Sequence, residues 1–241
     1  MIKDIFEAIK TAGRKIFTNW AASLISFLIY GALLGVVYLF ITTREATTLQ
    51  VLLTILILPL AAVFLFFVLQ AMGLSSVRHG VGTGYLLKRA ISDSWKLLLV
   101  SIPLLLIAIL VLLLGGAVNS RAMVYLSYLI LYLALPSIAI HLWLSTVRDG
   151  IAGAFRGIGG SIKQAMGPRS LLIYALFVLV FGMLAYLLFF TKTPLSNEWA
   201  ELWLFGARLT AALFSIFTGW LLTLGSIAEL TAKPALKESD N

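Results

Sequence analysis

Residues 97–118 read LLLVSIPLLLIAILVLLLGGAV, a stretch of 22 residues without a charged side chain. A helix needs about 20 apolar residues to cross the hydrocarbon core of a bilayer. The sequence has six stretches of this kind and so predicts six transmembrane segments, at residues 20–41, 49–72, 97–118, 122–144, 171–190 and 202–224. These continuous apolar runs lack the period-two alternation of a membrane β-barrel, so we expect all of them to be helices.

The composition of the whole chain agrees with this class. Of the 241 residues, 61% are apolar and 12% are charged, whereas soluble domains carry about 25% charged residues. The chain has no cysteine, which excludes disulfides, thiol catalysis, thiolate metal sites and a lipoprotein anchor. We expect neither a cofactor nor a metal ion.

Basic residues mark one side of the predicted membrane protein. Of its 18 Lys and Arg residues, 14 fall at the termini and in the two long connections, 73–96 and 145–170. The four on the opposite side are Arg44, Arg121, Lys192 and Arg208. Cytoplasmic loops carry such an excess, so both termini are predicted to be cytoplasmic, in a multi-pass protein of the cell inner membrane. The expected partners of this charge are anionic lipid headgroups and not nucleic acid.

Amphipathic segments precede the first, third and fifth predicted spans, at residues 2–17, 87–96 and 151–166. In each segment, apolar side chains recur at helical spacing opposite Lys and Arg. This pattern is typical of a helix that lies in the headgroup plane. The third segment is the weakest of the three, because its four glycines lower its helix propensity.

An internal repeat accompanies these segments. Residues 74–81, LSSVRHGV, return 70 positions later as residues 144–151, LSTVRDGI, and residues 224–229 are a fainter third copy. The sequence thus predicts an all-α membrane bundle in one domain, built from three parallel repeats of an amphipathic helix and a transmembrane hairpin. The repeat units are about 1–73, 74–143 and 144–227, and a polar cytoplasmic tail follows at 228–241.

The paired segments 74–80 and 144–150, with the basic helix before Trp20, resemble a loosely defined set of bacterial six-span inner-membrane proteins. This set includes the membrane domain attached to some glycerophosphodiester phosphodiesterases and several related uncharacterised families. The resemblance covers the whole chain as a pattern of spans and implies the six-span fold. It brings no catalytic motif, because the soluble phosphodiesterase domain with its metal-binding carboxylates has no counterpart in this sequence.

Two ionisable residues fall inside predicted spans, where such residues are candidates for function. His141 is a candidate ligand for a haem or pigment metal or a proton relay; the other interpretation is an interfacial histidine hydrogen-bonded to a neighbouring helix. Arg208 is a candidate for binding an anionic headgroup or substrate. It is otherwise expected to reach the interface or to pair with Glu201.

Basic residues at the cytoplasmic edge form a second group of lipid- or anion-binding candidates: Arg78, Arg148, Lys88 and Arg89. Arg78 and Arg148 occupy equivalent repeat positions beside hydroxyl side chains, an arrangement that suits phosphate. The alternative is that they only anchor the topology.

Small residues predict close helix packing. They stand four residues apart in the first span, at Gly31 and Gly35, and in the sixth. The sixth-span set is Ala207, Ala211, Ser215 and Gly219. The sequence leaves open whether they pack within the chain or against another subunit.

No nucleophile, base or metal ligand set forms a recognisable motif, so we expect no catalytic residues and no enzyme. The leading hypothesis is a structural or accessory subunit that organises lipid or a larger membrane complex, with other membrane subunits as partners. The first alternative is a transporter or channel for an apolar or amphiphilic solute such as a lipid. A pigment- or haem-binding subunit of an energy-transducing complex, resting on His141 alone, is the second.

Overall fold

The computed structural model describes residues 1–44, 46–78, 83–117, 120–191 and 197–232, and within them the chain is helical with no strand. Two π-helical turns, Leu53–Ile57 and Ile130–Ala134, join α3 to α4 and α6 to α7. The α-helices are α1 (Ile2–Thr18), α2 (Trp20–Thr42), α3 (Thr48–Leu52), α4 (Leu58–Arg78), α5 (Thr83–Ala117), α6 (Arg121–Leu129), α7 (Leu135–Arg156), α8 (Ile158–Ala165), α9 (Pro168–Phe190) and α10 (Glu198–Ala232).

Six helical segments in this described part are long and apolar enough to cross a membrane. They coincide with the six predicted spans, so the all-α membrane fold is confirmed. The third span begins earlier than predicted, at Gly84, because the amphipathic segment 87–96 continues directly into the span as α5. It is therefore not a separate interfacial helix. The predicted end of this span, Val118, lies outside the described residues.

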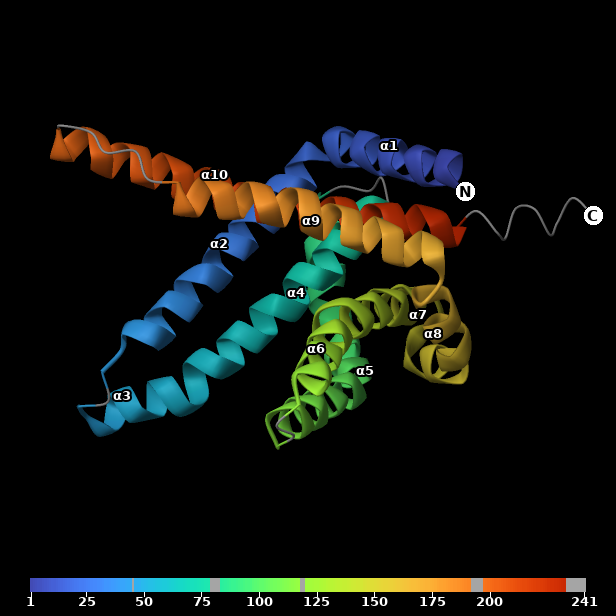
Figure 1. Cartoon of the computed structure of the whole chain (residues 1–241), viewed down its shortest axis with the longest axis horizontal. Helices are drawn as coiled ribbons and strands as arrows, with labels where there is room; N and C mark the ends of the chain where they lie inside the picture. The colour runs from blue at the N-terminus through green and yellow to red at the C-terminus, as the bar shows by residue number, and fades with distance from the viewer. Residues whose placement is uncertain (45, 79–82, 118–119, 192–196, 233–241) are drawn as a thin grey trace, which may run out of the picture.

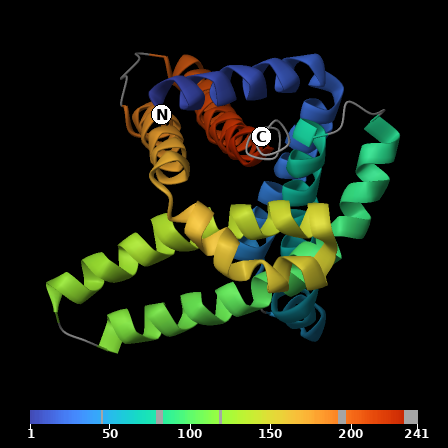
Figure 2. The same ribbon diagram turned by 90° about the vertical axis from the view of Figure 1, so that its right-hand side faces the viewer.

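The spans pair as three hairpins: α2 with α3 and α4, α5 with α6 and α7, and α9 with α10. Figure 1 shows the hairpins diverging from a shared centre, and Figure 2 shows the second hairpin projecting away from the others. We call the region where they meet the basic end, because α1, the start of α5 and α8 lie there with most of the Lys and Arg residues. The opposite ends of the hairpins are the distal ends.

The hydrophobic core lies at the basic end. Its buried side chains include Leu74, Leu144 and Leu224, the first residue of each copy of the repeat. Farther from this end, large apolar side chains such as Ile41, Leu113 and Phe190 are exposed. The most apolar stretch of α10 is 61% buried, against 22% or less in the other five spans. α10 is therefore the central helix, and the rest of the apolar surface is left for lipid or other helices.

Prolines shape the second helices of the first two hairpins. Pro59 and Pro136 are each the second residue of an α-helix that directly follows a π-helical turn. A proline ring clashes with the carbonyl of the residue four positions earlier. A π turn has wider spacing between bonded groups, and this spacing makes room for the ring. The first two hairpins share this π turn and proline, as two copies of a repeat would. The threefold repeat stays a prediction.

Gly150 separates the fourth span from the third amphipathic segment. Its φ is +75°, and it is the one positive φ in the described part of the chain. Glycine adopts this conformation without the steric penalty of a side chain. The chain bends there and continues through the end of α7 into α8. The equivalent repeat residue, Gly80, lies outside the described residues.

The two predicted small-residue stripes differ in their surroundings. Gly31 and Gly35 are exposed, and a Cβ built on either would meet nothing within 4 Å. In α10, Ala207 and Ala211 are also exposed. The other two residues of that stripe pack inside the third hairpin: Gly219 is buried against Phe181 of α9, and the Ser215 hydroxyl donates to the Phe181 carbonyl at 3.3 Å.

The close contact at Gly219 predicts a selective effect of a single methyl group. In Gly219→Ala, the new Cβ would lie 2.6 Å from the Phe181 Cβ, so α9 and α10 must move apart. We expect the free energy of unfolding to fall by about 1–3 kcal/mol, measured by thermal unfolding in detergent. Gly206→Ala is the matched control on the same helix, since its Cβ would meet nothing within 4 Å. Equal stability of the two variants would contradict this packing.

Candidate functional site

A polar cavity of about 520 Å³ opens at the basic end between α1, α7, α8 and α10. Charged and hydroxyl side chains line it together with backbone exposed at glycines. Its lining residues are Lys15, His141, Leu144, Ser145, Arg148, Asp149, Gly153, Gly157, Gly160, Ser161, Gln164, Ala228, Glu229, Thr231 and Ala232. The cavity lies at the bend between the fourth span and the third amphipathic segment.

Two ion pairs stand at this polar cavity. Lys15 of α1 pairs with Glu229 of α10, and this pair joins the amphipathic helix to the central helix. Arg148 donates from Nε to both carboxylate oxygens of Asp149, at 2.9 and 2.8 Å. The Ser145 hydroxyl donates to the same carboxylate at 3.4 Å. The cavity wall therefore presents each positive side chain next to a carboxylate.

His141 forms the inner wall of this cavity. It is 4% exposed, and its Nε2 lies 3.0 Å from the Ser170 hydroxyl of α9. This is the hydrogen bond to a neighbouring helix that one of the two sequence interpretations predicts. Among the described residues, no group of three or more His, Asp or Glu residues is placed to hold a metal ion.

A smaller cavity of about 220 Å³ shares His141 and Gln164 with the polar cavity and reaches the start of α9. Arg169 lines it and pairs with Asp4 of α1, with 3.3 Å between Nη2 and the carboxylate oxygen. Three cations, Lys15, Arg148 and Arg169, thus surround the two connected cavities, each with an acidic partner.

Glycines make room for the polar cavity. Gly153, Gly157 and Gly160 line one wall, and a Cβ on Gly160 would meet nothing within 4 Å. The sequence interpretation treated these glycines only as weak points of an amphipathic helix. Gly153 belongs to α7, Gly157 lies between the two helices, and Gly160 belongs to α8. Their spacing of four and three residues is the sequence signal for this wall.

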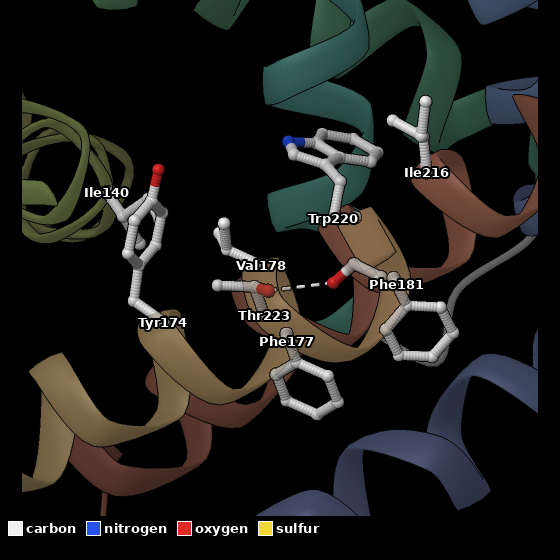
Figure 3. Close-up of a pocket in the computed structure, with 10 residues that line it drawn as sticks. Ile140, Tyr174, Phe177, Val178, Phe181, Ile216, Trp220 and Thr223 are labelled. Atoms are coloured by element: carbon white, nitrogen blue, oxygen red, sulfur yellow. Dashed lines mark hydrogen bonds between the residues drawn. The ribbon is translucent and has the colours of Figure 1, made fainter. Parts of the chain in front are cut away.

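An apolar groove lies next to the polar cavity on its distal side, between α7, α9 and α10. Its volume is about 260 Å³, and its lining includes Tyr174, Phe177 and Phe181 of α9 and Trp220 and Thr223 of α10 (Figure 3). The other lining residues are Ile140, Val178, Gly182, Ile216 and Gly219. The Thr223 hydroxyl donates to the Gly219 carbonyl at 2.7 Å (Figure 3), so it presents little polar character to the groove.

The predicted anion-binding residues Lys88 and Arg89 lie on α5, beside a cavity of about 350 Å³ near Gly150. A buried carboxylate, Asp93, occupies the centre of this basic group. The Lys96 ammonium donates to it at 2.6 Å, and Arg89 Nε lies 3.5 Å from its second oxygen. Asp93 therefore offsets part of the positive charge of Arg89 and Lys96, which remain partly exposed.

Two further predicted residues fall elsewhere. Arg208 lies near the distal end and donates from Nη1 to the Thr191 carbonyl at 2.6 Å. Thr191 follows the last residue of α9, so the guanidinium caps the negative end of that helix. It does not line the polar cavity. The position of Arg78 at the end of α4 is described, but its side chain lies outside the described part.

The chain was compared with known proteins in three ways. Neither protein-family models, nor curated proteins, nor solved structures give a match. The resemblance to six-span inner-membrane families stays an expectation.

The Lys15–Glu229 pair predicts how firmly α1 is held. In Lys15→Gln, we expect the free energy of detaching α1 from the rest of the chain to fall by about 1 kcal/mol. Amide hydrogen exchange in α1 should then be roughly fivefold faster. Lys10→Gln is the control, because Lys10 is exposed on the same helix. The exchanged pair Lys15→Glu with Glu229→Lys should restore protection. Unchanged exchange in Lys15→Gln would contradict the role of this ion pair.

Proposed function

We propose that the protein is a non-enzymatic accessory subunit of the cell inner membrane that organises lipid at the cytoplasmic leaflet, with its basic end in the cytoplasm. The observation that carries the proposal is the concentration of core packing at the basic end, with hairpins that diverge beyond it. A chain that leaves most of its apolar span surface unburied depends on surrounding lipid or helices to cover that surface.

The distribution of charge supports contact with anionic headgroups. At the basic end, the described part holds 12 Lys and Arg residues against five Asp and Glu residues. Apolar side chains of α1 and of the start of α2, such as Phe6, Phe17 and Trp20, are exposed beside these charges. Exposed aromatic and basic side chains together suit the membrane interface.

A second function, movement of an amphiphile such as a lipid across the membrane, draws support from the polar cavity and the adjoining apolar groove. The two proposals differ in one measurable respect. Movement requires that a fluorescent phospholipid exchange between leaflets faster in vesicles that contain the protein, whereas a lipid-organising subunit leaves that rate unchanged.

The proposal predicts a charge-dependent lipid preference. In bilayers that contain the protein, spin-labelled phosphatidylglycerol should associate with it more than spin-labelled phosphatidylcholine, and salt should weaken the difference. Substitution of Arg78 or Arg148 by Gln should lower the relative association by up to about fivefold per residue. Arg121→Gln, at the opposite side of the membrane, is the control. Equal association of the two lipids with the unaltered protein would contradict the proposal.

A further inference from the structure

We infer that the polar cavity and the apolar groove form one binding site for a single phospholipid whose headgroup carries both a phosphate and a primary ammonium, as in phosphatidylethanolamine. The inference rests on the proposed function and deepens it, because it assigns one lipid to a defined place inside the chain. It is distinct from the general preference for anionic lipid around the basic end.

The two spaces share helices α7 and α10, and the small cavity, which shares His141 and Gln164 with the polar cavity, brings in α9. On α7, Ile140 lines the apolar groove and the next residue, His141, lines the polar cavity. On α9, Ser170 lines the small polar cavity and Tyr174, one turn farther from the basic end, lines the groove. The polar cavity lies at the basic end and the apolar groove on its distal side. A lipid of the cytoplasmic leaflet places its headgroup and its acyl chains in the same order.

The charges of the cavity specify the headgroup. Arg148 and Lys15 supply cations for a phosphate, and their partners Asp149 and Glu229 are carboxylates that accept N–H groups from an ammonium. A headgroup with phosphate alone would meet these carboxylates unfavourably. A quaternary ammonium has no N–H to donate to them. This wall therefore favours a headgroup that carries both charges and N–H donors.

Donors for the phosphate remain available. Arg148 uses only Nε for Asp149. Its two terminal nitrogens make no hydrogen bond or ion pair within the described part of the chain. The Arg148 side chain is 57% exposed, so these nitrogens are accessible from the cavity. Guanidinium binds phosphate with charge-assisted hydrogen bonds, often in pairs.

The groove suits an acyl chain. Its walls are aromatic and aliphatic side chains, and its one hydroxyl from threonine is already bonded to a carbonyl. The Trp220 indole N–H donates to Gln70 of α4 at 3.0 Å, so the polar edge of this ring is satisfied away from the groove. Apart from the Tyr174 hydroxyl, the polar side chains of this lining keep their hydrogen bonds when an apolar chain fills the space.

Glycines allow the site to be filled without removal of any side chain. Gly160 faces the polar cavity and Gly182 the apolar groove, and a Cβ on either meets nothing within 4 Å. Two other glycines with open surroundings, Gly159 on α8 and Gly206 on α10, line neither space. Leucine at Gly160 or Gly182 therefore fills the site, whereas leucine at Gly159 or Gly206 does not. All four positions have open space for the new side chain.

The experiment uses native mass spectrometry of the full chain in mild detergent with phosphatidylethanolamine, phosphatidylcholine or phosphatidylglycerol of identical acyl chains. We expect one phosphatidylethanolamine per chain to be retained in preference to the other two lipids. Gly160→Leu and Gly182→Leu should each weaken its retention by at least about tenfold, while Gly159→Leu and Gly206→Leu keep it. Arg148→Gln should also weaken it by about tenfold, through the lost hydrogen bonds to phosphate.

Equal retention by the Gly160 and Gly159 variants, or by the Gly182 and Gly206 variants, would overturn the site. Retention of phosphatidylglycerol or phosphatidylcholine as firmly as phosphatidylethanolamine would overturn the assignment of the headgroup. If a leucine variant fails to fold, photo-activatable phosphatidylethanolamine on the unaltered protein provides the test. Its acyl-chain adducts should map to residues 174–182, and adducts confined to other helices would contradict the site. Loss of this site with a persisting preference for anionic lipid would leave the proposed function standing.

Discussion

Close packing and hydrogen bonds between helices both concentrate at the basic end. Apolar contact alone does not drive helices together in a bilayer, because lipid tails are as apolar as leucine. Association therefore concentrates where polar side chains meet. The Trp143 indole donates to Ser101 at 2.8 Å, Trp220 to Gln70 at 3.0 Å, and the Ser137 hydroxyl to the Ala165 carbonyl at 3.0 Å. These bonds join α7 to α5, α10 to α4 and α7 to α8.

The divergence of the hairpins is a consequence of this arrangement. Their distal halves are built from leucine, isoleucine and phenylalanine, which pack equally well against lipid. Near the basic end, polar contacts bring the helices together into a packed core. The glycines around Gly150, which have no side chains, leave open space beside it. The polar cavity and the apolar groove lie at this boundary, so the features that hold the helices together also create the candidate site.

Long-range features of the fold were predictable from the sequence, whereas details of the site were not. Six spans follow from the length and apolarity of the runs. For His141 the sequence left two interpretations open, and the hydrogen bond to Ser170 became visible only in the structure. The continuity of α5 was missed, because an amphipathic pattern does not say whether a helix bends at the interface. The cap formed by Arg208 depends on where separate segments meet, which single-segment periodicity does not specify. The pairing of Arg89 with Asp93, four residues later on the same helix, follows from helical spacing alone.

Helices α2 and α10 touch near the basic end and separate beyond it (Figure 1). Near this contact, the ring centroids of Phe27 and Phe214 are 5.7 Å apart. Because the chain has no cysteine, spin labels can be placed on engineered cysteines at positions 28 and 214, or at 40 and 202. In lipid nanodiscs, double electron–electron resonance measures the distance between the two labels of each pair. The distance for the 40/202 pair should exceed that for the 28/214 pair by more than a helix diameter, about 10 Å. Equal distances for the two pairs would show a closed parallel bundle and contradict this account.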